Sequence, residues 1–138
     1  MKTSAGILIV YKDKLLLCHP TNASWTNTYS PPKGLIDEDE DLIDAAIREC
    51  KEEVGIAVDR NQIVDKFYVP YKKGRNLYKK VYLYKISINS LSEIGLDSEI
   101  IPKDRLQLEE VDWAGFVSKS EIEEKIFWRF KTILSEIF

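Results

Sequence analysis

Apolar runs alternate with polar segments along the chain and predict a set of strands. Residues 6–11 and 15–18 are short apolar runs separated by polar residues, a pattern typical of buried strands. Residues 63–71 and 77–88 predict two longer strands joined by a hairpin-type loop. A last strand is expected over residues 111–117. Polar residues dominate from 19 to 33, which predicts a loop, and residues 89–105 have no clear pattern.

Two segments have the three- to four-residue spacing of an amphipathic helix. Residues 40–54 predict the first helix, and Gly55 occupies the position at which a glycine usually ends one. Ser118 and Glu121 resemble a capping box, which predicts a second helix running toward Phe138. The order of strands, helix, strands and helix predicts an α/β class, with a mixed sheet and packed helices in one domain over residues 1–138. The apolar stripe of the first helix consists of Ile43, Ala46, Ile47, Cys50 and Val54.

Composition and charge narrow the class of protein. Hydrophobic residues make up 44% and charged residues 31% of the 138, as in an ordinary soluble globular domain. The net charge of −3 argues against general nucleic-acid binding, which needs a basic surface. No signal peptide or membrane-spanning run is visible, and Cys18 and Cys50 are expected to be reduced and buried. We therefore expect a cytoplasmic protein, monomeric or homodimeric, with no membrane partner.

The segment with the clearest chemistry lies at the first predicted helix. Glu49, Glu52 and Glu53 are three and four residues apart, so their carboxylates share one helix face beside the apolar stripe. Crowded carboxylates repel one another, and a hard divalent cation such as Mg²⁺ relieves that repulsion. Arg48 can pair with Glu52 at i+4, and Gly34 lets the backbone approach a metal or phosphate closely. An acidic run of this kind is usually only a solvated face, but the complete spacing from Gly34 onward favours a metal site.

Residues 34–56, GLIDEDEDLIDAAIRECKEEVGI, resemble the Nudix box, with Cys50 in a position more often filled by Ile, Leu or Val. The resemblance implies an α/β/α sandwich that hydrolyses a nucleoside diphosphate linked to another group. It implies that Glu49, Glu52 and Glu53, with the Gly34 backbone, hold Mg²⁺ or Mn²⁺, and that one glutamate orients or deprotonates the attacking water. By the same resemblance, Arg48 supports the carboxylates through an ion pair. Glu40 is structural and fastens the loop or the helix start.

Other candidate site residues lie outside this segment. Nudix enzymes often use a further acidic residue, and Glu109 and Glu110 are the best candidates, with Glu93 and Glu99 behind them. Lys33 precedes the box glycine and can meet a phosphate. His19, the only histidine, lies beside the same loop and is either a phosphate contact or an ordinary solvated histidine.

Basic and aromatic residues are interleaved along the two longer predicted strands. Such a group can hold phosphates and stack a base, although strand aromatics are more often packing residues. Lys80, Tyr82 and Tyr84 are our candidate substrate contacts within it. The group consists of Lys72, Lys73, Arg75, Lys79 and Lys80, with Tyr71, Tyr78, Tyr82 and Tyr84.

Residues 25–34, WTNTYSPPKG, resemble the corresponding segment of diadenosine tetraphosphate hydrolases of the Nudix family. Extra residues between Trp25 and the prolines, and the absence of Pro-Gly before Glu40, depart from that pattern. We expect a nucleotide-type small molecule as substrate, with dinucleoside polyphosphates first. ADP-ribose or nucleotide-sugar substrates and triphosphorylated RNA 5′ ends remain alternatives. A non-catalytic nucleotide sensor and a plain interaction domain are alternatives from other classes, against which the complete box speaks.

Overall fold

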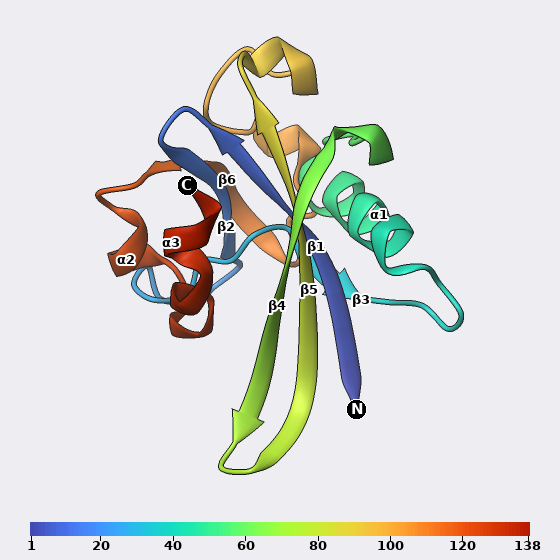
Figure 1. The fold of residues 1–138 in the computed structure, drawn as a ribbon. Coiled ribbons are helices and arrows are strands. Elements are labelled where there is room, and N and C mark those ends of the chain that lie inside the picture. Colours follow the sequence, from blue (N-terminus) through green and yellow to red (C-terminus); the bar gives the residue numbers. More distant parts are fainter.

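Strand β1 lies at the centre of a six-stranded mixed sheet in the computed structural model, which describes residues 1–138 (Figure 1). The strand order is β4-β5-β1-β2-β6, and β3 pairs separately with the N-terminal half of β1. The β1–β5 pair is parallel, and the other pairs are antiparallel. The strands are β1 Lys2–Tyr11, β2 Lys14–Pro20, β3 Lys33–Leu35, β4 Ile63–Lys73, β5 Asn76–Ile88 and β6 Val111–Ser118.

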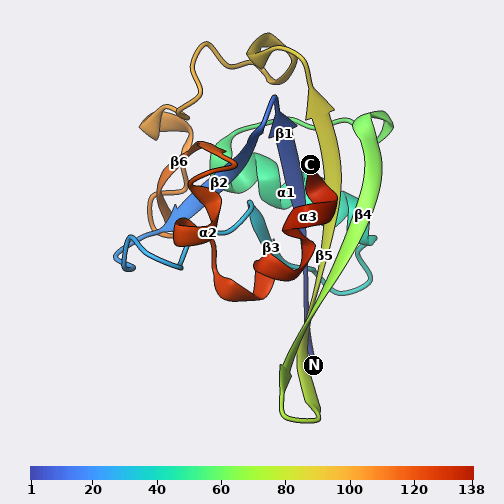
Figure 2. The same cartoon turned by 60° about the vertical axis from the view of Figure 1, so that its left-hand side comes forward.

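The two faces of the sheet are covered by different parts of the chain (Figure 2). Successive strand residues point to opposite faces, so Ile7 and Ile9 pack with α1 (Leu42–Val54), whereas Leu8 and Val10 pack with the C-terminal segment. The layers are therefore helix, sheet and helix. This arrangement confirms the α/β/α sandwich with a mixed sheet.

Local sequence signals position α1 as predicted, to within two residues of the expected start. The Asp41 side chain accepts hydrogen bonds from the backbone N–H groups of Ile43 and Asp44. At the other end, Gly55 adopts a left-handed conformation with φ of 69° and donates its N–H to the carbonyl of Lys51. The buried stripe of α1 includes Cys50, which is a free, buried thiol like Cys18.

The predicted continuous helix from Ser118 to Phe138 is wrong. Ser118 is the last residue of β6, and the segment after it is broken at Ile126 and Phe127, whose backbones are extended. The Phe127 N–H donates to the carbonyl of Tyr29, and the Tyr29 N–H donates to the carbonyl of Lys125. These long-range bonds replace helical ones, although the apolar residues of the segment are still buried. The resulting short pieces are α2 Ile122–Lys125, the 3₁₀ helix η4 Trp128–Ile133 and α3 Leu134–Ile137.

Strands β4 and β5 form a long hairpin that extends beyond the rest of the domain (Figures 1 and 2). Both predicted strands are confirmed and are longer than expected, with the turn at Gly74, whose φ is 61°. The unassigned stretch after β5 contains two 3₁₀ helices, η2 Leu91–Ile94 and η3 Lys103–Arg105, and a third, η1 Arg60–Gln62, precedes β4. No helix in the structure combines the length and the apolar character needed to cross a bilayer.

Candidate active site

Arg48 is the centre of a hydrogen-bond network at the acidic face of α1. Its Nε and one terminal nitrogen each donate to Glu40 at 2.8 Å. The other terminal nitrogen donates to Glu49 at 2.9 Å and to Glu52 at 3.2 Å. The predicted i+4 pair with Glu52 is therefore confirmed, but it is longer than the contacts with Glu40 and Glu49. One guanidinium thus fixes two candidate metal-binding carboxylates against the loop that precedes the helix.

Glu53 is the most buried carboxylate of the face, at 7% exposed. Its Oε1 accepts the backbone N–H of Lys33 at 3.0 Å, which ties α1 to β3. Burial raises the pKa of Glu53 to about 8, and the nearby Glu49 and Glu110 carboxylates push it in the same direction. Glu53 therefore differs from an ordinary surface glutamate in its readiness to hold a proton near neutral pH.

Gly34 leaves the space that the Glu49 carboxylate occupies. A Cβ atom built at Gly34 would overlap that carboxylate, so any side chain here forces Glu49 to move. Burial raises the pKa of Glu49, while the hydrogen bond from Arg48 lowers it. The glycine is thus required by close packing against the Glu49 side chain, rather than by a turn.

These residues line two adjoining hollows, which together form what we call the acidic cleft. The larger, of about 420 Å³, contains Gly34, Glu49 and Glu52, and the smaller, of about 230 Å³, contains Glu53. Lys33 and Glu110 line both hollows, so they join the two parts. The three box glutamates therefore border one continuous cleft although they do not point to a single spot.

The donor chemistry of the cleft suits a hard divalent cation. Carboxylate oxygens are the ligands that Mg²⁺ and Mn²⁺ prefer, and the mutual repulsion of Glu49, Glu53 and Glu110 is partly uncompensated. No three His, Cys, Asp or Glu side chains lie close enough together to form a ready metal site. A cation would therefore draw the carboxylates together. Before it binds, Arg48 holds Glu49 and Glu52, and the Lys33 N–H holds Glu53.

Two lysines form the basic wall of the cleft. Lys33 and Lys79 both line the larger hollow, together with the carboxylates. Burial lowers the pKa of Lys33, and burial with the nearby charges of Lys33 and Lys2 lowers the pKa of Lys79 to about 8. Acidic and basic groups that line one hollow are suited to a metal-bound phosphate chain.

Glu110, rather than Glu109, borders the cleft. Both are exposed, but Glu109 lines neither hollow, whereas Glu110 lines both. The two further candidates for this acidic residue have other partners, because Glu93 caps η2 and Glu99 pairs with Lys14 at 2.6 Å. Of the two predicted candidates for an acidic residue outside the box, Glu110 is therefore the one that lines the cleft.

The proposed phosphate contact by His19 is contradicted by the structure. The ring is fully buried, with Nδ1 2.5 Å from Asp112 Oδ1 and Nε2 3.0 Å from the carbonyl oxygen of Ser24. Both nitrogens are thus occupied by the protein. The indole of Trp25 stacks on the ring at 3.5 Å and is itself 57% exposed. His19 supports this loop, a role invisible to sequence reasoning because Asp112 is distant in the chain.

The remaining predicted substrate contacts are divided between different places. Lys80 lines neither part of the cleft, and its neighbour Lys79 does so instead. Tyr82 and Tyr84 line a separate hollow of about 230 Å³ beside Leu42, at the start of α1. Tyr84 is also buried against α1, which makes it a core residue. Of the predicted substrate contacts, only Lys33 lines the acidic cleft.

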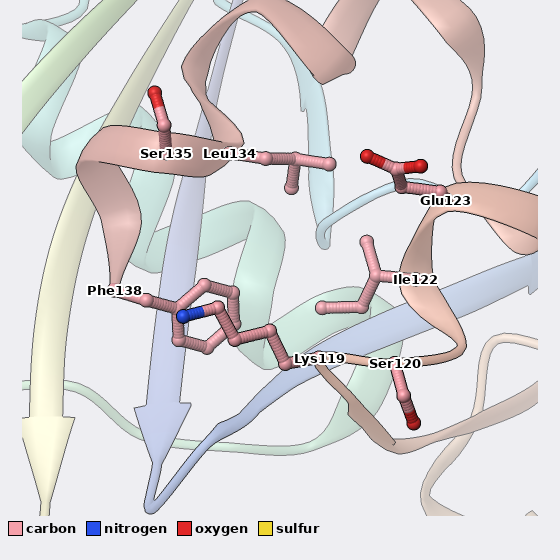
Figure 3. Close-up of a pocket in the computed structure, with 7 residues that line it drawn as sticks. All are labelled: Lys119, Ser120, Ile122, Glu123, Leu134, Ser135 and Phe138. Atoms are coloured by element: carbon pink, nitrogen blue, oxygen red, sulfur yellow. The ribbon is translucent and has the colours of Figure 1, made fainter.

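A further hollow of about 400 Å³ lies between α2 and α3, bordered by Lys119, Ile122, Leu134 and Phe138 (Figure 3). Its only acidic side chain is that of Glu123, and it shares no residue with the acidic cleft. It therefore lacks the group of acidic side chains that lines the cleft.

Comparison with known proteins agrees with the fold. The NUDIX domain family model matches residues 1–132, and the chain belongs to this family. The class defined by the fold and the cleft is therefore a Nudix hydrolase domain.

Among curated relatives, the mRNA-decapping protein g5R of African swine fever virus (isolate Warthog/Namibia/Wart80/1980) is 29% identical over 118 residues, covering 80% of this chain and 48% of the relative. The mRNA-decapping enzyme subunit 2 of Saccharomyces cerevisiae (strain YJM789) is 30% identical over 119 residues, covering 82% of this chain and 11% of the relative. The chain thus spans less than half the length of these relatives. Among solved structures, the Ap4A hydrolase of C. elegans in a binary complex matches with a TM-score of 0.59 and 23% identity, covering 99% of both chains.

Proposed function

We propose that the protein hydrolyses a diphosphate linkage in a nucleoside diphosphate derivative, with Mg²⁺ or Mn²⁺ held by Glu49, Glu52, Glu53 and the Gly34 backbone. Dinucleoside polyphosphates such as diadenosine tetraphosphate are the first substrate class. The observation that carries the proposal is that Glu49 and Glu52 line the same hollow as Lys33 and Lys79. The glutamates alone cannot bind a phosphate chain, and the lysines alone cannot bind its cation.

Each residue has a chemical task in this proposal. Lys33 and Lys79 bind phosphate oxygens, and Arg48 orients Glu49 and Glu52. Glu53 has Oε1 engaged by the Lys33 N–H, which leaves Oε2 to bind the cation, and one of the three glutamates orients or deprotonates the attacking water. When bound, the cation neutralises phosphate charge and lowers the pKa of coordinated water. No serine, cysteine or histidine nucleophile is needed, because the cleft positions water and stabilises charge.

A second candidate substrate is the 5′ end of a capped or triphosphorylated RNA. The two curated relatives described above are mRNA-decapping proteins, and this observation favours an RNA end. A cap consists of two nucleosides joined by a polyphosphate, so it presents the same linkage as a free dinucleoside polyphosphate. A capped RNA differs from such a dinucleotide chiefly in the RNA chain attached to one nucleoside, whereas a triphosphorylated end lacks the second nucleoside.

A product assay on matched substrates tests the function. Diadenosine tetraphosphate, ADP-ribose, a nucleoside triphosphate, and capped and triphosphorylated RNA are each incubated with Mg²⁺, with Mn²⁺ and with chelator, and the products are separated by chromatography. We expect metal-dependent cleavage of a dinucleoside polyphosphate or a capped RNA, and none with chelator. Tight nucleotide binding without any cleavage would overturn the proposal in favour of a sensor domain.

The variant Glu53→Gln gives the matched test of the site. It keeps an oxygen for the Lys33 N–H, so the fold should persist, but it removes one charge from the cleft. We expect turnover to fall by roughly 100-fold or more, as for loss of a metal-binding or proton-accepting group. The control is Glu123→Gln, an exposed glutamate of the hollow in Figure 3. Near-wild-type activity of Glu53→Gln, with a wild-type melting curve, would remove Glu53 from the site.

A further inference from the structure

Charge is strongly segregated along this chain. Between Asp65 and Glu93 there is no acidic residue, although the whole chain has 23 acidic and 20 basic residues. The same segment contains seven basic residues and corresponds to the β4–β5 hairpin and the residues that follow it. The net charge of −3 therefore hides a basic hairpin on an acidic domain. The basic residues of the segment are Lys66, Lys72, Lys73, Arg75, Lys79, Lys80 and Lys85.

The positive charges of the hairpin have no acidic partners. Ion pairs elsewhere engage Lys14, Arg48, Arg60 and Lys125, but none engages a basic residue of the hairpin. Lys72, Lys73 and Arg75 at the hairpin tip are all exposed. An exposed, unpaired cluster of like charges costs stability through self-repulsion, and an anionic partner relieves that cost.

Aromatic side chains are interleaved with these charges on the side facing η4. The Arg129 guanidinium lies 4.8 Å from the ring centre of Tyr71, 5.6 Å from that of Tyr78 and 4.3 Å from that of Trp128. It also donates to the Tyr78 hydroxyl and to the carbonyl of Lys72, both at 3.1 Å, which fixes η4 against the hairpin. Tyr78 and Trp128 remain 43% and 57% exposed, so each presents ring surface to solvent.

This surface is continuous with the acidic cleft. Lys79 lines the larger hollow of the cleft, and its ammonium group also lies 5.1 Å from the ring centre of Tyr71. Tyr71 in turn contacts Arg129 and Tyr78. A path of positive charge and aromatic rings therefore leads from the cleft along the hairpin to its tip. We call this path the hairpin surface, and it consists of Lys72, Lys73, Arg75, Tyr78, Lys79, Trp128 and Arg129.

We propose that the hairpin surface binds the single-stranded RNA chain attached to a 5′ end that lies in the acidic cleft. This inference rests on the proposed function, and of its two candidate substrates it selects the RNA 5′ end. Lysine and arginine neutralise successive phosphates, while exposed Tyr and Trp rings stack on unpaired bases without reading sequence. A single strand fits better than a duplex, because stacking on Tyr78 and Trp128 needs bases that are free of a partner strand.

A binding assay without turnover tests the hairpin surface directly. The probe is an unstructured, uncapped 20-nucleotide RNA with a 3′ fluorophore, measured by anisotropy with chelator over a range of salt. The test variant is Lys72→Ala/Lys73→Ala/Arg75→Ala. The control is Lys51→Ala/Lys103→Ala/Lys119→Ala, which removes three exposed charges elsewhere.

We expect the test variant to bind at least about tenfold more weakly at low salt. The slope of log affinity against log salt should fall by roughly 2, since each single-strand phosphate contact contributes about 0.7. The control should behave like the wild type. Equal affinities and slopes for the two variants would overturn the proposal.

A second variant separates RNA from any polyanion. Trp128→Ala removes a largely exposed ring, so its fold should be intact. We expect its RNA affinity to fall by roughly tenfold, the usual loss for one stacked base, with no loss in affinity for inorganic polyphosphate. A polyphosphate of equal charge that competes as well as RNA, with no effect of Trp128→Ala, would replace the RNA assignment with a general anion surface.

The two proposals can fail separately. Binding of uncapped RNA with chelator does not depend on hydrolysis, so it stands or falls without the cleft chemistry. Hydrolysis of diadenosine tetraphosphate depends on the cleft and involves no RNA chain. If the substrate is an RNA end, the Lys72→Ala/Lys73→Ala/Arg75→Ala variant should also raise KM for a long capped RNA more than for a free cap dinucleotide. Equal increases in KM for both would count against a path for the RNA chain.

Discussion

Arg48 binds both carboxylate oxygens of Glu40, at 2.8 Å each, across the loop that begins α1. The same guanidinium reaches Glu49 and Glu52, so the loop and the helix face are fastened at one point. These hydrogen bonds lower the pKa of Glu40 to about 2. The resemblance to the Nudix box implied a structural Glu40 and a supporting Arg48, and Arg48 contacts both Glu40 and the carboxylates of the helix.

The Arg48–Glu40 contact makes a prediction for stability against pH. Glu40→Gln should lower the free energy of unfolding by about 1 kcal/mol at pH 7, because one charged hydrogen-bond acceptor is lost. The pKa of Glu40 is depressed in the folded state, so this stabilisation is present above the ordinary value of 4.5 and is lost as pH falls toward 2. Urea unfolding at pH 7 and pH 3 should show the difference shrinking at the lower pH. A difference that is unchanged at pH 3 would argue against the charged contact.

Gly34→Ala tests the close packing of Gly34 against Glu49. The added Cβ overlaps the Glu49 carboxylate and displaces it, so we expect turnover to fall by roughly 100-fold. Steady-state kinetics at increasing Mg²⁺ should also show a higher metal requirement. The control is Gly74→Asn at the hairpin turn, where no atom lies within 4 Å of an added Cβ and asparagine tolerates a positive φ. Normal kinetics for Gly34→Ala would show that Glu49 is free to move without consequence.

The neighbours Glu109 and Glu110 form a matched pair. Glu110 lines both parts of the acidic cleft and Glu109 lines neither, so Glu110→Gln should lower turnover roughly tenfold or more, while Glu109→Gln should not. Both changes remove one exposed negative charge, so the two variants have the same net charge and differ only in the position of the lost carboxylate. Equal activities of the two variants would exclude a direct part for Glu110, and the reverse order would restore Glu109.

Lys79 predicts a change in substrate affinity with pH. Its pKa is about 8 in the folded protein, because burial and the charges of Lys33 and Lys2 disfavour its charged form. The phosphate-binding charge is therefore present at pH 7 and lost as pH rises through 8, so KM should increase by several-fold between pH 7 and pH 9. Lys79→Arg stays charged throughout and should flatten the rise. The matched variant Lys80→Arg should keep the wild-type profile, and a profile flattened by Lys80→Arg instead would reverse the assignment.

Local sequence determined the parts of this protein whose causes lie within a few residues. The helix over residues 42–54 follows from its apolar spacing, the Asp41 cap and Gly55. Because side chains three and four residues apart share a helix face, the grouping of Glu49, Glu52 and Glu53 was already fixed by their spacing. Five of the six strands were also predictable, since alternation and apolar runs are local signals, whereas β3 (Lys33–Leu35) forms only by pairing with β1.

The tertiary structure decided what depends on contacts between distant residues. Backbone bonds from Tyr29 break the helix expected after Ser118, and Asp112 holds His19 in the interior. Strand pairing turns Lys79 toward the cleft in place of Lys80. The physical reason is that a side chain's direction along a strand, and a backbone group's hydrogen-bond partner, are set by whichever segment lies beside them in space.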